Sequence, residues 1–281
     1  MRATKRRPDT KKVGFLEEIV TAGENGATLL LSGFQCSRRI ILEAFRRVAY
    51  VVSRQFLLLM TAAGTIRPAV VLVLGAGVAG LQAIATAKRL CTRVEAFDAR
   101  PAVREQIQSL GATFLEMELP QDAETAGGYA KEQSASFLKR EQEVIGARFP
   151  TVDVVISTAQ VFGNRAPVLV TREMLKSLRP GSVIVDLAAE QGGNCELTQA
   201  SQTIEHEGII VVGATNVPAM LPIDASQFYA HNVVSLFRYL YPATGVQPES
   251  TDELVQGVCV TCDGKIIHPL LQSLVKEEVS R

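Results

Sequence analysis

Short, continuous apolar runs alternate along the middle of the chain with segments whose apolar residues return every three or four positions. The continuous runs predict buried parallel strands that start near residues 71, 94, 113, 153, 183 and 209. The periodic segments between them predict helices over residues 81–90, 103–110, 131–147 and 171–178. Strands that alternate with helices in this way are typical of the α/β class with a doubly wound parallel sheet.

Helical patterns also flank this sheet in the sequence. Apolar residues spaced by four predict a long helix over 37–63, and a similar pattern predicts another over 225–240. A shorter helical pattern covers 13–20, while residues 255–269 alternate like a strand and turn at Asp263-Gly264, which predicts a β-hairpin. Two long helices would thus join the sheet to an incomplete second domain. We expect three regions: the remnant of a first domain with its linking helix (1–64), the sheet domain (65–222), and a returning helix and hairpin that pack with the first domain (223–281).

The segment 120–133 interrupts the alternation of strands and helices. It is polar and acidic, contains the pair Gly127-Gly128, and has Tyr129 as its one aromatic side chain. Loops of this length inside a compact domain are usually either functional or disordered. Because the segment buries little apolar surface to offset the entropy of ordering, we expect a mobile surface loop.

Composition narrows the possible partners. Lys plus Arg and Asp plus Glu both total 29, so the chain has no net charge that would favour nucleic acid or an anionic membrane surface. The five cysteines suit a reducing compartment better than a disulfide scaffold. No run reaches 18 consecutive apolar residues, so we expect no membrane insertion. The basic first 12 residues predict a solvated tail; the alternative, a mitochondrial presequence, would need an apolar face that they lack.

The strand at 71–74 runs into a glycine-rich turn that is typical of dinucleotide-binding (Rossmann) domains. Gly75 permits the tight turn, Gly77 lets the backbone approach a pyrophosphate, and Gly80 lets the next helix pack closely on the strand. Asp98 ends the following strand, where a carboxylate accepts hydrogen bonds from the adenine ribose and repels a 2′-phosphate. The pattern therefore predicts NAD(H) rather than NADP(H), although Arg100 could stack on adenine or meet a phosphate. The alternative is an ordinary βαβ turn whose glycines serve packing alone.

Other residue types that carry chemistry form no clear constellation. Cys259 and Cys262 make a single C-x-x-C without a second pair, so we expect no metal site. The three histidines, at positions 206, 231 and 268, stand in no recognisable relation to a nucleophile or a carboxylate. Asp186, Glu190 and the turn 191–194 follow the carboxyl end of a strand, so they are either site residues or turn and cap residues.

Several longer motifs make the assignment more specific than the glycine fingerprint. They are TAAGTIRPAVVLVLGAGVAGLQAIATAKRL, FDAR, EQIQSLGA, ETAGGYAKE, STA at 157–159, GSVIVDLAAEQGGNCE and CVTCDGKIIHP. Between residues 39 and 269 the chain resembles the NAD(H)-binding component, domain I of the alpha subunit, of the proton-translocating nicotinamide nucleotide transhydrogenases, which are relatives of the alanine dehydrogenases. ETAGGYAKE resembles the mobile loop that closes over NAD(H) in transhydrogenases, and it discriminates best between the two groups.

The resemblance implies a set of cofactor contacts by position. They are Ala76, Gly77 and Val78 at the phosphates, Asp98, Ala99 and Arg100 at the adenosine end, Gly128 and Tyr129 in the mobile loop, and Gln160 near the nicotinamide half. The candidate cofactor-binding residues also include Gly75 and Gly80 of the fingerprint and Thr158 and Ala159 of the STA motif. The chain departs from the family at 159–163, where a TALIPG-like run is usual, and at 213–218, where GYTDLP is usual. Residues 1–36 do not reproduce the family's Arg-Gln-Asp loop, so we expect a truncated or diverged first domain.

The resemblance further implies that the chain passes a hydride between NADH and NADP⁺ held on a partner domain, while a membrane domain couples this to proton translocation. Such a transfer needs positioning of two rings rather than an acid–base pair, so no catalytic side chain is expected. The partners would be the NADP(H)-binding domain, the membrane domain and a second copy of the chain. The chain would be a peripheral component on the cytoplasmic face of a bacterial inner membrane or on the mitochondrial matrix side. The alternatives are an alanine dehydrogenase-like amino-acid oxidoreductase and a non-catalytic NAD(H)-binding subunit.

Overall fold

The computed structural model describes most of the predicted sheet domain and some of the flanking segments. The described residues are 13–15, 59–61, 64–117, 135–160, 165–220, 222–242, 252–262 and 265–267. The chain divides into two compact units, one of residues 34–225 and one of residues 1–33 with 226–281. The larger unit contains the sheet and, by residue number, all of the predicted cofactor contacts.

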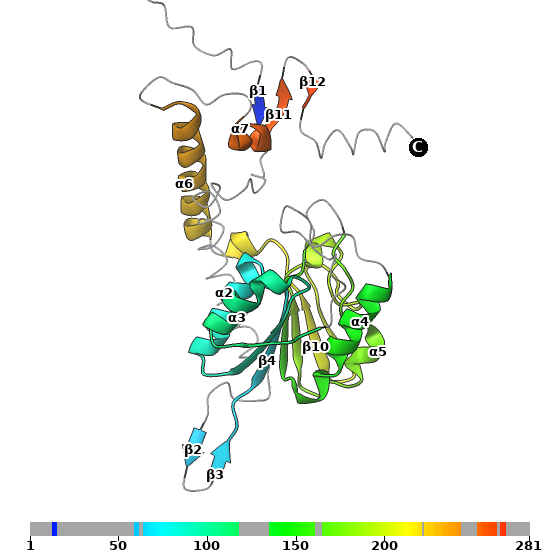
Figure 1. Ribbon diagram of the computed structural model, residues 1–281. Coiled ribbons are helices and arrows are strands. Elements are labelled where there is room, and N and C mark those ends of the chain that lie inside the picture. The colour runs from blue at the N-terminus through cyan, green and yellow to red at the C-terminus, as the bar shows by residue number, and fades with distance from the viewer. Residues whose placement is uncertain are drawn as a thin grey trace, which may run out of the picture. The chain divides into compact units, whose positions relative to one another are not determined.

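A seven-stranded sheet forms the centre of the larger unit (Figure 1). Its strands lie in the order β6-β5-β4-β7-β8-β10-β9. Every neighbouring pair is parallel except β10 with β9, which is antiparallel. The strands are β4 (Val70–Leu74), β5 (Arg93–Phe97), β6 (Thr113–Phe114), β7 (Val154–Ser157), β8 (Val183–Asp186), β9 (Thr203–His206) and β10 (Ile209–Gly213).

Helices cover both faces of this sheet, because successive residues of the central strands point to opposite sides. On β4, Val71 and Val73 belong to one apolar core, together with residues of α2 and α3, whereas Leu72 and Leu74 belong to a second core with residues of α4 and α5. The helices are α2 (Val78–Arg89), α3 (Arg104–Ser109), α4 (Ala135–Gly146) and α5 (Arg172–Leu175). Short 3₁₀ turns lie at Pro101–Val103, Phe149–Thr151, Ala189–Gln191 and Val217–Met220. The predicted doubly wound parallel α/β sheet is confirmed.

The sequence pattern missed one strand. β9 forms a hairpin with β10, in which His206 pairs with Ile209 and only Glu207 and Gly208 lie between the strands. Both linking residues have positive φ, at 53° and 76°, as the two central residues of a type I′ turn require. Residues of β9 alternate between exposed and half-buried, as suits an edge strand. Its pattern is therefore weaker than that of the buried strands.

Two predicted helices were wrong in the segments that the structure describes. Leu59–Thr61, at the end of the predicted 37–63 helix, form β2, which pairs antiparallel with β3 (Gly64–Ile66). Gly64 has φ +136°, a conformation that glycine adopts readily and that ends the helical pattern. Val13–Phe15, at the start of the predicted 13–20 helix, form β1, which pairs with β11. The remainder of both predicted helices lies outside the described residues.

The C-terminal hairpin was predicted correctly, but the segment that leads into it was not. β11 (Cys259–Cys262) pairs antiparallel with β12 (Lys265–Ile266), so the chain reverses between residues 262 and 265 as expected. The preceding residues form α7 (Glu253–Val258) rather than a strand. The Asp252 side chain caps this helix by accepting from Leu254 N and Val255 N. This cap stabilises a helix where the alternating apolar pattern predicts a strand.

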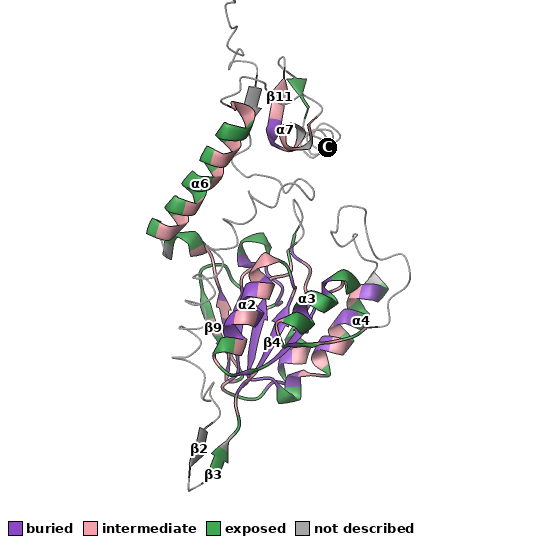
Figure 2. Cartoon of the chain, turned by 60° about the vertical axis from the view of Figure 1, so that its left-hand side comes forward, coloured by how far each residue is buried: buried purple, intermediate pink, exposed green. Residues whose placement is uncertain are grey.

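The last long helix differs from those of the sheet domain. α6 (Pro222–Leu240) begins three residues before its predicted start and contains no buried residue. Figure 2 shows α6 in exposed and intermediate colours only, whereas the central strands are buried. None of the helices in the described regions of the chain is both long and apolar enough to cross a membrane.

Candidate functional site

The order of the strands identifies where a ligand would bind. From β4 the chain continues to β5 and β6 on one side, and then crosses to β7, β8 and β10 on the other. In open α/β sheets, ligands bind at the carboxyl ends of the strands where the strand order reverses. Here that point lies between β4 and β7. The segments that leave these two strands, Gly75–Val78 and Thr158–Gln160, consist entirely of predicted cofactor contacts, so the candidate site is built around them.

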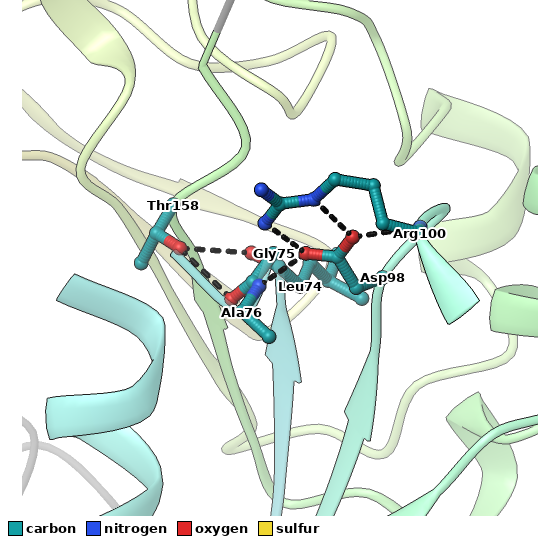
Figure 3. Close-up of polar contacts among 6 residues, drawn as sticks. All are labelled: Leu74, Gly75, Ala76, Asp98, Arg100 and Thr158. Atoms are coloured by element: carbon teal, nitrogen blue, oxygen red, sulfur yellow. Dashed lines mark hydrogen bonds and ion pairs between the residues drawn. The ribbon is translucent and has the colours of Figure 1, made fainter. Parts of the chain in front are cut away.

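Two residues of these segments meet directly at the turn that ends β4. Gly75 has φ +89°, and a Cβ there would lie 2.9 Å from Thr158 Oγ1. The Thr158 hydroxyl donates towards Leu74 O and Gly75 O, at 3.2 and 3.0 Å, and Thr158 N donates to Leu74 O at 2.8 Å (Figure 3). The ends of β4 and β7 are therefore tied together at the point where the strand order reverses.

The other two glycines of the fingerprint have opposite surroundings. A Cβ on Gly80 would lie 1.9 Å from Gly75 O, so only glycine lets α2 pack this closely on the turn. A Cβ on Gly77 would meet nothing within 4 Å. Gly77 is the N-cap of α2 and forms no side-chain cap, and the first helical bond of α2 runs from Leu81 N to Gly77 O at 2.9 Å. The N–H groups of the first turn therefore have no partner inside the helix, and the space beside Gly77 is open.

Asp98 lies beside this turn at the end of β5. The residue is 9% exposed, and its carboxylate accepts from Ala76 N at 2.6 Å and from Arg100 N at 2.8 Å. The Arg100 guanidinium completes the set, with Nε 3.0 Å from Oδ1 and Nη2 3.0 Å from Oδ2 (Figure 3). Asp98, which the sequence predicts as the acceptor for a ribose, is thus paired with Arg100. A ribose diol would have to replace the Arg100 guanidinium.

A second acid near Asp98 was not predicted. Glu141 on α4 is only 3% exposed and lies on the same helix face as the buried Phe137 and Ile145. Burial, and then the negative charge of Asp98, raise the pKa of Glu141 to about 7. The sequence did contain a signal for this buried acid. Glu141 lies four residues after Phe137 and four before Ile145, so it interrupts an otherwise apolar helix face.

The carboxyl ends of β7 and β8 carry a buried polar network. Asp186 and Asn194 are both fully buried, and Ser157 Oγ lies 2.6 Å from Asn194 Oδ1 and 3.2 Å from Asp186 Oδ1. Gln160 reaches across the two strand ends, since its Nε2 donates to Leu187 O at 3.0 Å. Asp186 and Asn194 therefore act as turn residues, one of the two roles that their positions allowed.

Some of the remaining predicted residues lie at the same edge of the sheet, and others lie outside the described residues. Val78 opens α2, and Ala99 links Asp98 to Arg100, so both belong to the same edge of the sheet. Gly128 and Tyr129, with the rest of the predicted mobile loop, lie outside the described residues, as does the departure at 161–163. Glu190 is exposed and accepts from Asn216 N.

Two of the three histidines lie on elements other than those that carry the predicted contacts. His206 lies on β9 with its Nε2 3.9 Å from Glu207 Oε1, and His231 lies on α6, in the smaller unit. His268 lies outside the described residues. Burial raises the pKa of the Cys195 thiol to about 11, so it remains protonated at neutral pH. Within the described ranges, no three His, Cys, Asp or Glu side chains gather as metal ligands do.

Comparison with known proteins points to one family. A family model, described as the alanine dehydrogenase/PNT C-terminal domain, matches residues 44–269. A protein of Rhodospirillum rubrum, described as the first part of NAD(P) transhydrogenase subunit alpha, is 47% identical over 230 residues, which are 79% of this chain and 59% of that protein. The protein of the same description from Rickettsia prowazekii is 37% identical over 271 residues, 96% of this chain and 69% of its own length. The chain thus spans about three fifths of the first of these relatives.

Solved structures agree with this assignment. A transhydrogenase from Sinorhizobium meliloti matches with a TM-score of 0.72 and 36% identity, over 92% of this chain and 66% of that structure. An L-alanine dehydrogenase matches with a TM-score of 0.69 and 22% identity, over 94% and 69%, which supports the fold alone.

Proposed function

Starting from the fact that this chain belongs to the alanine dehydrogenase/PNT C-terminal domain family, we propose that it is the NAD(H)-binding component of a proton-translocating NAD(P) transhydrogenase. In this function it holds NADH so that a hydride passes to NADP⁺ on a partner domain, while a membrane domain couples the transfer to proton movement. The relatives at 47% and 37% identity carry the transhydrogenase description over most of this chain.

The observation that carries cofactor binding is the contrast among the three glycines. Gly75 and Gly80 have no room for a Cβ, so packing within the protein explains them. Gly77 has open space around it, so packing does not explain it. A pyrophosphate that approaches the N-terminus of α2 does explain it, because the phosphate oxygens would fill the space and accept from the N–H groups that the helix leaves unpaired.

The strand order supports a proposed position for each end of the cofactor. Asp98 on the β5 side would accept the two hydroxyls of the adenine ribose, with Arg100 displaced from the carboxylate. The second mononucleotide half would then lie over β7 and β8, next to Ala159 and Gln160. The bound nicotinamide supplies the hydride chemistry, and these residues fix its position.

The charge at Asp98 supports NAD(H) over NADP(H). A 2′-phosphate would bring a second negative charge to a carboxylate that is 9% exposed, where screening by water is weak. Arg100 already neutralises Asp98, so the preference depends on how far its guanidinium moves when a nucleotide binds.

The remaining elements of the proposal concern partners and the predicted loop. We propose that the segment 120–133 closes over NAD(H) with Tyr129 against the cofactor, which would exclude water from the hydride path. The partners are the NADP(H)-binding domain, the membrane domain and a second copy of this chain. The proposed location is peripheral, on the cytoplasmic face of a bacterial inner membrane or on the mitochondrial matrix side.

The alternative enzyme is an alanine dehydrogenase-like amino-acid oxidoreductase. An alanine dehydrogenase 1 of Staphylococcus aureus is 38% identical over 95 residues, but these are only 32% of this chain. Formation of NADH that depends on an added amino acid would favour this alternative. A third alternative, a non-catalytic NAD(H)-binding subunit, would bind NADH and transfer no hydride.

Nucleotide binding is tested by titrating the chain with NADH and following the fluorescence of the nicotinamide, with Gly77→Ala and Gly80→Ala as a matched pair. Gly77→Ala should keep the fold and weaken NADH about tenfold or more, because its Cβ projects into the proposed phosphate space. Gly80→Ala should instead lower the free energy of unfolding by at least about 2 kcal/mol. If Gly77→Ala binds NADH like the original chain, the proposed phosphate position is wrong.

Hydride transfer is tested separately, by reconstituting the chain with NADP(H)-binding and membrane domains of a transhydrogenase. Reduction of an NADP⁺ analogue by NADH is the expected result. NADH binding without any transfer would support the non-catalytic subunit.

A further inference from the structure

Asn194 uses the whole hydrogen-bonding capacity of its side chain in the interior of the protein. The residue is fully buried, and its Oδ1 accepts from Ser157 Oγ at 2.6 Å and from Ala159 N at 3.1 Å. Its Nδ2 donates to Ala159 O and to Pro167 O, both at 2.8 Å. One carboxamide therefore binds both backbone groups of Ala159, the second residue after β7.

Asp186 in turn holds the backbone of Asn194. Its buried carboxylate accepts from Asn194 N at 2.7 Å and from Cys195 N at 3.0 Å. Ala188 N and the Thr198 hydroxyl also donate to it, at 3.0 and 2.6 Å. The loop that follows β8 is thus wrapped around Asp186, and it presents Asn194 to the end of β7.

The main chain of Asn194 adds a third attachment. Asn194 O accepts from Leu169 N at 2.9 Å and from Val170 N at 3.0 Å. Together with the bond from Nδ2 to Pro167 O, these contacts fix Asn194 to the segment that returns towards α5. These contacts with residues 167–170 fix Asn194 in place, and Ala159 is the group that its carboxamide positions.

The position of Ala159 matters because of where the proposed cofactor lies. Ala159 and Gln160 leave β7 at the edge of the half-sheet assigned to the nicotinamide, while Asp98 and Gly77 belong to the adenosine and phosphate end. Ala159 N also lies beside the Gly75 turn, 3.0 Å from where a Cβ on Gly75 would be, so a shift at Ala159 would disturb the nicotinamide end most and the adenosine end least. Small displacements of a reacting ring have large effects on transfer rates.

We propose that Asn194 is a positioning residue for the nicotinamide half of the site, acting by holding the Ala159 backbone by both its N–H and its C=O. This inference rests on the proposed NAD(H) site. It requires a side chain that donates and accepts at once, which Asn provides and ionised Asp does not. In Asn194→Asp, a carboxylate oxygen would face the carbonyls of Ala159 and Pro167 with no proton between them.

The test compares two ligands that share the adenosine and phosphate end and differ in the nicotinamide. Binding of NADH and of ADP-ribose is measured by calorimetry for the original chain, Asn194→Asp and the milder Asn194→Ser. We expect the variants to weaken NADH about tenfold and ADP-ribose less than about threefold. Thr92→Val is the matched control, because it removes a buried hydroxyl that donates to Ala87 O at 2.9 Å, ahead of the amino end of β5. It should change neither affinity.

A second measurement needs no variant, and it tests whether the segment that Asn194 holds responds to the nicotinamide even if both Asn194 variants fail to fold. Amide hydrogen exchange across Thr158–Gln160 should slow further with NADH than with ADP-ribose. Equal loss of both ligands in the variants, or equal protection by both ligands in the original chain, would overturn the positioning role. If the original chain binds neither ligand, the proposed NAD(H) site itself is wrong. If it binds both, and the variants and the exchange experiment show no difference between NADH and ADP-ribose, only the role of Asn194 is wrong.

Discussion

Asp98 and Asp186 stand at corresponding places in the two halves of the sheet, and the protein uses them in different ways. Each lies at the carboxyl end of the strand next to the central pair, β5 beside β4 and β8 beside β7. Asp98 is 9% exposed and shares its charge with the side chain of Arg100, whereas Asp186 is 0% exposed and accepts from three backbone N–H groups and the Thr198 hydroxyl. The Arg100 guanidinium on Asp98 can be exchanged for a ligand while the two bonds from Ala76 N and Arg100 N stay in place. The partners described for Asp186 are backbone N–H groups and hydroxyls of the protein interior, so this carboxylate shapes the loop around it.

The largest effect that would test this comparison is expected at Asp186. Asp186→Ala removes the acceptor of Asn194 N and Cys195 N, and it leaves these buried donors without that partner. We expect the free energy of unfolding to fall by about 3–5 kcal/mol. Denaturant unfolding followed by circular dichroism measures it. A loss below about 1 kcal/mol would mean that the loop after β8 does not depend on this carboxylate.

Glu141 adds a pH dependence to the Asp98 half of the sheet domain. Its folded pKa of about 7 is above the ordinary value of 4.5, so the protonated acid favours the folded state. This contribution is complete below pH 4.5 and is lost as the pH rises through 7. Relative to Glu141→Gln, which cannot ionise, the original chain should lose about 3 kcal/mol of stability between these limits.

The pH experiment compares denaturant unfolding of the two proteins at three pH values, one near the ordinary pKa of a glutamate, one near the raised value and one above it. The difference in unfolding free energy should move in favour of the Gln variant as the pH rises. A difference that stays constant with pH would show that Glu141 has the same pKa in the folded and unfolded chain.

Asp98 should show the opposite balance to Asp186, with a large effect on binding and a smaller one on folding. We expect Asp98→Ala to weaken NADH about ten- to a hundredfold, to narrow the gap between NADH and NADPH, and to lower the free energy of unfolding by about 1–3 kcal/mol, because Ala76 N loses a buried acceptor. Fluorescence titrations with both nucleotides measure this. Arg104→Ala is the control, since it breaks an exposed ion pair with Glu116. Equal affinity of the original chain for NADH and NADPH would contradict the role assigned to Asp98.

The smallest effect is expected at Tyr129, in the segment proposed to close over the cofactor. Tyr129→Ala should leave stability almost unchanged, weaken NADH about threefold, and slow hydride transfer more than it weakens binding. Amide exchange across 120–133, with and without NADH, tests the closure directly. If NADH protects the turn at 75–80 and leaves 120–133 unchanged, the segment is a linker and Tyr129 has no place in the site.

The sequence predicted the fold where a single local signal was strong. β4, β7, β8 and β10 are built on continuous apolar runs, and their boundaries differ from the predicted ones by a few residues at most. β9 was missed because an edge strand is half-polar, and because its turn is Glu207-Gly208 rather than the Asn-Gly or Asp-Gly pair that signals a two-residue hairpin. The α7 segment was interpreted as a strand because its apolar alternation outweighed the cap at Asp252.

Of the candidate site, the sequence could predict residues but not their partners. The glycines and Asp98 follow a fixed spacing, so they were found. The engagement of Asp98 by Arg100, the burial of Glu141 and the hold of Asn194 on Ala159 depend on contacts that only the folded chain makes. Ala159 and Asn194 lie 35 positions apart, and no local pattern connects residues at that distance.

The pair of Arg100 and Asp98 has a consequence for how fast a nucleotide leaves. Because the guanidinium is attached two residues from the carboxylate, it can return as the ribose departs, so Asp98 regains its cationic partner during the dissociation step. In the proposed function, spent nucleotide must be exchanged for fresh nucleotide once in every turnover. The arginine would then set the residence time of the cofactor, so that its removal should lengthen the bound lifetime and make product release slower.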